Sequence, residues 1–156
     1  MQRTLVMLKP DAVQRGLVGR ILARFEAKGL KIVALKLGRI DRASAERHYA
    51  AHRGKDYYEP LIRFVTSGPT VFLVLEGKGA VAVVRRMLGA TFGADAEPGT
   101  IRGDFGMSNR FNLVHGSDSP ETADREIAMF FRPEELIPWD PATRPWTYDF
   151  STGEPV

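Results

Sequence analysis

One histidine of this chain lies in a segment rich in groups that donate or accept hydrogen bonds. His115 is the fourth residue of the run NLVHGSD at 112–118, and Glu126 follows in the next segment. A neutral imidazole is a good nucleophile when a partner fixes its tautomer, and Ser117 and Glu126 are candidates for that partner. Gly116 leaves the approach to the ring open. From these residues alone, a histidine that is merely hydrogen-bonded at a turn is the commoner outcome, so both interpretations stay open.

Four other side chains could hold a polyphosphate beside this histidine. Transfer of a phosphoryl group is catalysed mainly by positioning and by stabilising charge, so His115 would need cations and donors around it. Lys9 would supply a point charge, whereas Arg85 and Arg102 can each donate two hydrogen bonds to neighbouring oxygens, and Thr91 offers a hydroxyl. Taken singly, each is more often a solvated surface group.

The charges divide unevenly along the chain. Residues 1–110 carry 19 Lys and Arg against 10 Asp and Glu, a net of +9, while residues 111–156 have a net of −6. A basic region can serve a nucleic acid, a membrane surface or a polyanionic small ligand, and composition does not choose among them. There is no cysteine, which excludes disulfides, thiolate zinc sites and cysteine nucleophiles.

The length and the apolar pattern bound the kind of protein. A chain of 156 residues fits one domain. The longest apolar run, residues 71–75, is far shorter than the roughly 18 residues that a membrane helix needs, and the first residues lack the features of a signal peptide. We therefore expect a protein that is neither exported nor inserted into a membrane, and a cytoplasmic location.

Hydrophobic periodicity predicts alternating strands and helices. The second predicted strand carries Val33, Leu35 and Leu37 on one face, and Asp41 is placed to cap a helix that contains Ala45 and Tyr49. Strands are predicted over 4–8, 31–40, 70–76 and 111–115, and helices over 17–25, from 41, over 57–65, over 80–88 and from Ser119, whereas 89–104 is predicted to be a loop.

The order of these elements predicts the fold. Helices that connect successive strands suggest two βαβ halves with right-handed crossovers, which form a four-stranded antiparallel sheet with helices packed on one side. The predicted class is an α+β sandwich of the ferredoxin-like kind, one domain over 1–156. Residues 132–156 form an irregular C-terminal segment with five of the ten prolines and both tryptophans, and we expect its rings to pack on the body or on a neighbouring subunit.

Three segments resemble the signature segments of the nucleoside diphosphate kinase family. They are KPDAVQRG at 9–16, GTIRGD at 99–104 and NLVHGSDS at 112–119, and the resemblance runs from about Arg3 to Glu135. It implies a ping-pong phosphotransferase that moves the γ-phosphoryl group of a nucleoside triphosphate to a nucleoside diphosphate. His115 matches the histidine that is transiently phosphorylated, by family precedent on Nδ1. This resemblance raises the functional interpretation of His115 above the structural one.

The resemblance also implies roles for other positions. Ser117 and Glu126 match residues that orient the histidine, and Asp118 matches an acid that lies near a magnesium ion held mostly by phosphates and water. Tyr57 matches an aromatic position that stacks on the base, with Leu61 beside it. The positions that match contacts to the phosphates and sugar are Lys9, Tyr49, Arg85, Thr91, Arg102 and Asn112.

The implied partners are ribo- and deoxynucleoside tri- and diphosphates, Mg²⁺ and further copies of the chain, a hexamer being favoured over a tetramer. Two segments depart from the family pattern. Thr91 is followed by Phe92-Gly93 where many members have Asn-Pro, and residues 109–111 replace the commoner ones before the histidine segment. The resemblance therefore does not predict the conformation of this loop, the subunit contacts that it makes, or the contacts to the outer side of the base.

Two other functions stay open on the residues. A sandwich with a basic first part can bind single-stranded nucleic acid, although the second strand lacks paired aromatics for stacking, so nucleic acid is the less favoured partner. A phosphohistidine carrier would pass its phosphate only to a protein. A P-loop is absent, and His48 and His52 are separated as in a zinc protease, but Tyr49 stands where its Glu would be, so a solvated helix face is expected there.

Overall fold

The computed structural model describes all residues, 1–156, and contains one four-stranded sheet. Its order is β2-β3-β1-β4, and neighbouring strands are antiparallel. β1 is therefore parallel to β2, and β3 to β4, with one strand between the members of each pair. Two interleaved βαβ units of this kind make the predicted ferredoxin-like sandwich. The strands are β1 (Gln2–Leu8), β2 (Lys31–Gly38), β3 (Thr70–Gly77) and β4 (Val114–Gly116).

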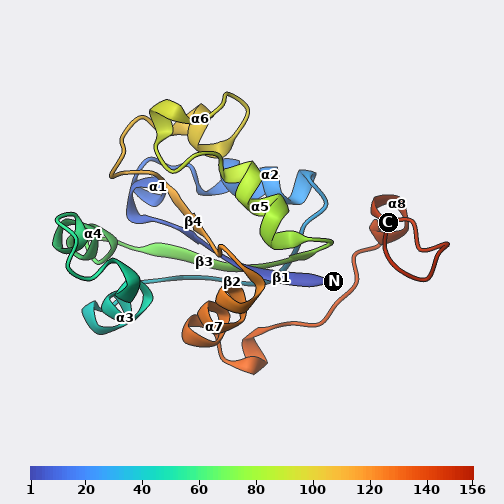
Figure 1. Cartoon of the computed structure of the whole chain (residues 1–156). Helices are drawn as coiled ribbons and strands as arrows, with labels where there is room; N and C mark the ends of the chain where they lie inside the picture. Colours follow the sequence, from blue (N-terminus) through green and yellow to red (C-terminus); the bar gives the residue numbers. More distant parts are fainter.

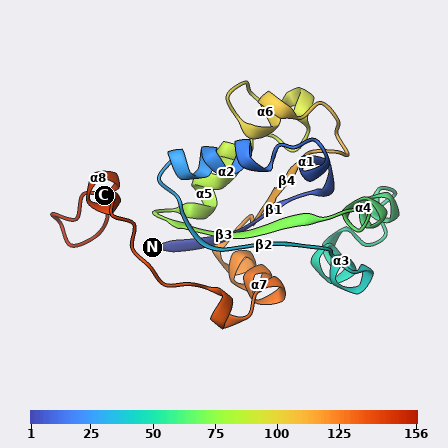
Figure 2. The ribbon, with the colours of Figure 1, turned by 180° about the vertical axis from the view of Figure 1, so that it is seen from behind.

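Helices cover both faces of the sheet, so the prediction of helices on one side is wrong (Figures 1 and 2). Alternate residues of β1 enter two separate cores: Val6 and Leu8 face the first, and Leu5 and Met7 face the second. On the first face lie α1 (Pro10–Gln14), α2 (Val18–Ala27), α5 (Ala80–Leu88) and α6 (Ile101–Phe105). On the second lie α3 (Arg42–His48), α4 (Tyr58–Val65) and α7 (Pro120–Phe130).

The predicted helix starts are confirmed where a side chain caps them. Asp41 accepts a hydrogen bond of 2.7 Å from the backbone N–H of Ser44, and Ser119 accepts one of 3.1 Å from that of Thr122. Each satisfies a donor that the first helical turn leaves free. α3 ends at His48, however, so Tyr49 follows the helix instead of lying inside it.

Three sequence predictions need correction. A bulge between Ile32 and Ala34 turns Val33 into the second core, whereas Leu35 and Leu37 lie on the other face and are exposed. The predicted loop over 89–104 contains the 3₁₀ helix η2 (Gly93–Asp95) and the start of α6. The fourth strand begins only at Val114, because Leu113 has a φ of 69° and breaks the extended backbone.

The C-terminal segment contacts the body in both halves, since the Lys78 N–H donates to the Tyr148 hydroxyl at 3.3 Å. The Trp139 indole N–H donates to the carbonyl of Ile32 at 2.8 Å, and the Ile137 N–H donates to that of Val33 at 3.0 Å. Trp146, in α8 (Arg144–Thr147), is 92% exposed, whereas Thr147 of the same helix lies against Gly29. The other short helices are η1 (Ala50–His52) and η3 (Pro133–Glu135). None of the helices has the length and apolar character required to cross a membrane.

Candidate active site

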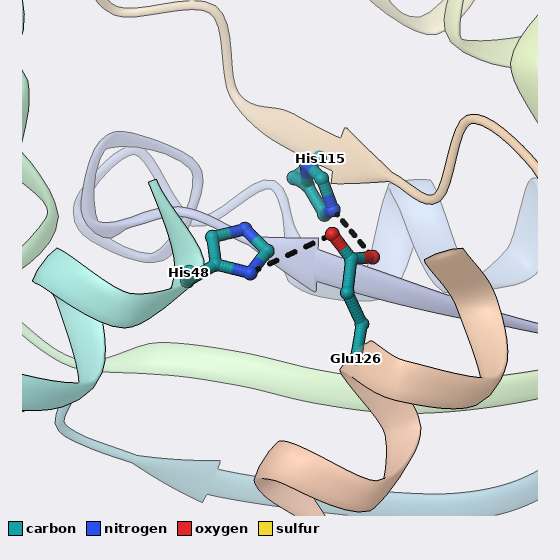
Figure 3. Close-up of side chains that lie close together, drawn as sticks. All are labelled: His48, His115 and Glu126. Carbon is teal, nitrogen blue, oxygen red and sulfur yellow. Dashed lines mark hydrogen bonds and ion pairs between the residues drawn. The ribbon is translucent and has the colours of Figure 1, made fainter. Parts of the chain in front are cut away.

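His115 lies on β4, held against Glu126 of α7 (Figure 3). β4 is an edge strand that pairs with β1, which places His115 opposite Met7. The His115 Nε2 atom is 3.0 Å from Oε2 of Glu126, and the Ser117 hydroxyl donates to the same oxygen at 2.7 Å. The structure therefore brings together the three residues that the sequence pattern singled out.

This arrangement fixes the chemistry of the ring. Burial raises the pKa of Glu126, but the hydrogen bonds from His115 and Ser117 and the charge of His115 outweigh it, so the pKa lies below its usual value. Glu126 is thus a carboxylate at neutral pH. It accepts a hydrogen bond from Nε2 of His115, which carries the ring proton. The second ring nitrogen, Nδ1, then carries the lone pair. A neutral imidazole with its tautomer held in this way is a nucleophile at Nδ1.

His48 is the residue that the sequence analysis missed. Its side chain is 1% exposed, so the expected solvated helix face is wrong, and its Nδ1 lies 3.6 Å from Oε1 of Glu126. Its ring stands edge-on to that of His115 with centroids 4.6 Å apart, as Figure 3 shows. Burial, and next the charge of His115, lower its pKa to about 3, so it is neutral. The sequence contains a signal for this burial, because His48 lies three residues after Ala45 on the same helix face, and Ala45 is buried.

Lys9, Asn112 and Thr91 form a chain of hydrogen bonds beside the histidine. The Lys9 ammonium donates to Oδ1 of Asn112 at 2.7 Å, and the Asn112 amide donates to the Thr91 carbonyl at 3.0 Å. Lys9 and Asn112 are buried, whereas the Thr91 side chain is exposed. Burial, and next the charge of Arg102, lower the pKa of Lys9 to about 8. The structure therefore brings these three predicted residues into one group.

Arg102 is mainly occupied with the backbone. Its guanidinium donates to the carbonyls of Gly89 at 2.9 Å, Asn112 at 3.1 Å and Val114 at 2.7 Å. These bonds join the end of α5 to the segment that carries the histidine. With a longer contact to the carbonyl of Ala90, they occupy most of the N–H groups of Arg102 that could otherwise bind a phosphate. Burial, and next the charge of Arg85, lower the pKa of Arg102 to about 10.

Arg85 has the opposite character. It lies in the last turn of α5, its side chain is exposed, and it has neither a hydrogen bond nor an ion pair. Its positive charge contributes to the lowered pKa of Arg102, so the two guanidinium groups repel each other. Two cations that repel each other gain most when an anion lies between or beside them. Arg85 is therefore free to bind a phosphate.

Asp11 was given no role in the sequence analysis, although it lies in the first signature segment. Its Oδ2 accepts a hydrogen bond of 3.0 Å from the backbone N–H of Leu113. Leu113 has the one positive φ among the non-glycine residues, 69°, and is fully buried. Such a conformation costs of order 1–3 kcal/mol and persists only where its surroundings fix it. Asp11 thus helps to hold the turn that leads into His115.

The remaining predicted residues are Tyr49, Tyr57, Leu61 and Asp118. Tyr49 is buried in the second core, and its hydroxyl has no hydrogen-bond partner. Tyr57 precedes α4, is 46% exposed, and its hydroxyl lies 2.8 Å from Nδ1 of His52. Leu61 is half-buried on α4, and Asp118 is exposed at the end of the histidine segment. No hydrogen bond joins Tyr57, Leu61 or Asp118 to the phosphate-side residues.

The fold and the site define a class: a ferredoxin-like α+β protein with a carboxylate-held histidine beside a cluster of cations, the features of a phosphotransferase. The family model described as nucleoside diphosphate kinase matches residues 2–136. A nucleoside diphosphate kinase of Thermus thermophilus is 63% identical over 137 residues, covering 88% of this chain and 100% of its own. One of Desulfitobacterium hafniense is 56% identical over 146 residues, covering 94% and 98%.

The similar solved structures are also nucleoside diphosphate kinases. The nucleoside diphosphate kinase of Halobacterium salinarum in complex with CDP superposes with a TM-score of 0.93 at 49% identity, covering 95% of this chain and 99% of its own. That of Babesia bovis has a TM-score of 0.91 at 43% identity. The chain belongs to the nucleoside diphosphate kinase family. It is an enzyme, a phosphotransferase, as the resemblance in its sequence implied.

Proposed function

We propose that this chain transfers the γ-phosphoryl group of a nucleoside triphosphate to a nucleoside diphosphate in two steps, through a phosphohistidine on His115. The observation that carries the mechanism is the Nε2 contact with Glu126, which leaves Nδ1 with the lone pair. In the first step, Nδ1 forms a bond to the γ-phosphorus, the bond to the bridging oxygen breaks, and the diphosphate leaves with that electron pair. In the second, a different diphosphate takes the phosphoryl group by the reverse reaction.

The surrounding residues fit the two ends of a nucleotide. We assign the phosphates and sugar to Lys9, Asn112 and Thr91, which hydrogen bonds join into one group, together with Arg85, Arg102 and Tyr49. We assign the base to the exposed ring of Tyr57, with Leu61 beside it. Stacking accepts every base because each has a π-face, so broad use of nucleotides is expected. The CDP bound to the Halobacterium relative supports a nucleotide as the ligand.

Magnesium fits this site as an ion that arrives with the phosphates. Mg²⁺ takes oxygen ligands and is usually bound through one or two carboxylates together with substrate phosphates. Asp118 is an exposed carboxylate three residues after His115, which suits a contact through water. When bound, the ion neutralises charge on the transferring group. The chain's own residues hold the nucleotide and aim Nδ1.

The chemical test separates this function from a phosphohistidine carrier. The protein is incubated with ATP labelled on the γ-phosphate, the acid-labile adduct is isolated, and it is then mixed with assorted nucleoside diphosphates. Rapid discharge onto ADP, GDP, CDP and dTDP is expected. An adduct that forms but resists all free diphosphates would favour the carrier, and steep salt-dependent binding of oligonucleotides without turnover would favour a nucleic-acid module.

Replacing the nucleophile tests the role of His115, with His52→Gln as the matched control. His115→Gln should form no adduct and lose exchange activity, because no other side chain offers Nδ1 at this position. His52→Gln, which replaces the one histidine that lies outside the group formed by His48, His115 and Glu126, should still form the adduct. Exchange that persists in His115→Gln would overturn the assignment. Unfolding monitored by circular dichroism would show that both variants fold.

We also infer a homo-oligomer, a hexamer before a tetramer, in the cytoplasm. The exposed Leu35 and Leu37 on edge strand β2 and the exposed Trp146 offer apolar surface for subunit contacts. Light scattering on a size-exclusion column, with and without residues 137–156, tests the assembly. A hexameric mass that falls on truncation is expected if the C-terminal segment makes a subunit contact. A monomer in the full chain would contradict the inference.

A further inference from the structure

The side chains of His48, His115 and Glu126 form a compact donor set that phosphoryl transfer does not use completely. One ligand atom of each lies within 4.8 Å of those of the other two (Figure 3). Within this set, Oε2 of Glu126 already contacts both His115 and Ser117, whereas Oε1 faces only His48. The proposed reaction employs His115 and Glu126 and leaves His48 without a task.

His48 is unusual for a buried polar side chain. Its side chain is 1% exposed, and neither of its ring nitrogens has a hydrogen-bond partner. Buried polar groups are almost always hydrogen-bonded, so an exception of this kind asks for an explanation. A neutral imidazole with a free lone pair is the form that binds a transition metal. Nδ1 of His48 is the nitrogen turned toward the carboxylate.

We propose that His48, His115 and Glu126 form a site for Zn²⁺, and that zinc bound there inhibits phosphoryl transfer. Two imidazoles and one carboxylate are a donor set that zinc accepts, with water as a fourth ligand. Zinc bonds of about 2.0–2.2 Å in a tetrahedron place ligand atoms roughly 3.4 Å apart. The separation of 3.6 Å between Nδ1 of His48 and Oε1 of Glu126 is close to that value, and ligand atoms of all three residues lie within 4.8 Å of one another.

Entry of the ion requires only side-chain movement. The longest separation must shorten by at most about 1.4 Å to reach tetrahedral bond lengths, which two imidazoles can share by rotation. The His115 side chain is 21% exposed and so opens the path from solvent. Ser117 can keep its hydrogen bond to Oε2 while Oε1 binds the metal. This hydrogen bond then fixes the orientation of the carboxylate without contacting the metal. The charge of Lys9, which also acts on His48, opposes the ion and limits its affinity.

The inhibition follows from where the proton goes. Zinc can bind Nε2 of His115 only after that nitrogen has lost its proton, since metal ligands must be deprotonated. A neutral ring with the metal on Nε2 carries its remaining proton on Nδ1. The Nδ1 lone pair that would attack the γ-phosphorus is then occupied. Mg²⁺ does not compete for this site, because it selects oxygen ligands and binds imidazole poorly.

Binding is tested first in the absence of nucleotide, because phosphates themselves bind zinc. The full chain, freed of metal with a chelator, is titrated with ZnCl₂ by calorimetry in a non-coordinating buffer. One zinc ion per chain is expected, and millimolar MgCl₂ should not displace it. His48→Gln should weaken binding by tenfold or more, about what the loss of even an outer partner of a metal ligand costs. His52→Gln is the matched control and should bind as the unsubstituted chain does.

A second measurement protects the test against a variant that fails to fold. The chain has three histidines, so NMR of the unsubstituted protein labelled with ¹⁵N in histidine shows three imidazoles. Zinc should shift those of His48 and His115 and leave that of His52 unchanged. Absence of saturable binding, binding that survives His48→Gln, or binding that is lost in His52→Gln would each overturn the proposal.

The inhibition depends on the proposed role of His115, and the two proposals can fail separately. Formation of the labelled phosphohistidine should slow in proportion to the occupancy that calorimetry measures. If zinc binds at the three residues but no adduct forms even without zinc, the proposed mechanism fails and the metal site stands. If the adduct forms and discharges normally while zinc binds elsewhere, the metal site fails and the mechanism stands.

Discussion

The phosphate end and the base end of the site are built in different ways. At the phosphate end, Lys9, Arg102 and Asn112 are buried and joined to each other or to the backbone by hydrogen bonds. At the base end, Tyr57 is 46% exposed, and its hydroxyl contacts only His52. The first end is preorganised and the second is open.

The difference corresponds to what each end has to do. Phosphoryl transfer depends on reacting atoms held in line and on charges already in place, and misplacement by about 1 Å can cost roughly a hundredfold in rate. A base needs only a flat apolar face if the enzyme accepts many nucleotides. Changes at the buried end should therefore affect both rate and stability, and changes at the exposed end should affect KM alone.

The largest effect is expected from Arg102. Arg102→Lys loses most of the bonds to the carbonyls of Gly89, Asn112 and Val114 and leaves buried acceptors without donors. We expect the free energy of unfolding to fall by about 3 kcal/mol and kcat/KM to fall by at least about a hundredfold. Urea denaturation and a coupled exchange assay measure both. Arg86→Lys, on the exposed side of α5, should leave stability unchanged. Equal stability of the two variants would show that the phosphate end is not built around Arg102.

Glu126→Gln should cost less, because it loosens the orientation of His115 and keeps the nucleophile. We expect kcat to fall by about tenfold to a hundredfold with little change in KM. Glu121→Gln, on the exposed first turn of the same helix, is the matched control and should be fully active. A rise in KM without loss of kcat would place Glu126 in nucleotide binding instead.

The buried position of Lys9 predicts a pH dependence. Its pKa of about 8 means that its charge is lost above that pH in the free enzyme. kcat/KM, which reports the free enzyme, should fall about tenfold per pH unit above 8, whereas kcat should fall less because bound phosphates retain the charge. Between this pKa and the ordinary value of 10.5, the unfolded chain binds more protons, so the free energy of unfolding should rise.

Two controls separate this loss of charge from unfolding. Lys9→Arg keeps its charge throughout this range and should flatten the decline of kcat/KM. The free energy of unfolding, measured at the same pH values, should move in the opposite direction to activity. A decline that is unchanged in Lys9→Arg would assign it to another group.

The smallest effects are expected at the base end. Tyr57→Ala removes the stacking surface, and at an exposed site this costs about 1 kcal/mol, or roughly a fivefold rise in KM. Tyr57→Phe keeps the π-face and loses only the contact with His52, so KM should change by less than about twofold. Neither substitution should alter stability. A large loss in Tyr57→Phe would mean that the hydroxyl, not the ring, holds the nucleotide.

The elements with strong local signals were predictable. The apolar runs gave the two central strands, β1 and β3, and the caps at Asp41 and Ser119 gave the starts of α3 and α7. The order of strands and helices predicted the ferredoxin-like sheet, and the motif around His115 predicted its partners. These features depend on neighbours in sequence, where periodicity and capping act.

The errors arose where distant segments decide the outcome. The bulge in β2 reverses the side-chain alternation after Val33, and only pairing with β3 reveals it. The positive φ of Leu113 is held by Asp11, about a hundred residues earlier, and it shortens β4. Helices on the second face of the sheet follow from the two cores, which the order of elements did not indicate.

By itself, the sequence determined which side chains could do the chemistry, because the identity and spacing of His115, Ser117 and Glu126 are local properties. Only the tertiary structure decided which atoms of these residues meet. The packing of α3 and α7 on one face of the sheet brings His48 and Glu126 to the histidine on β4. Burial there keeps His48 neutral, whereas the hydrogen bonds from His115 and Ser117 keep Glu126 charged despite its burial. The carboxylate then holds Nε2 of His115, and so selects the nitrogen of that ring that is free to react.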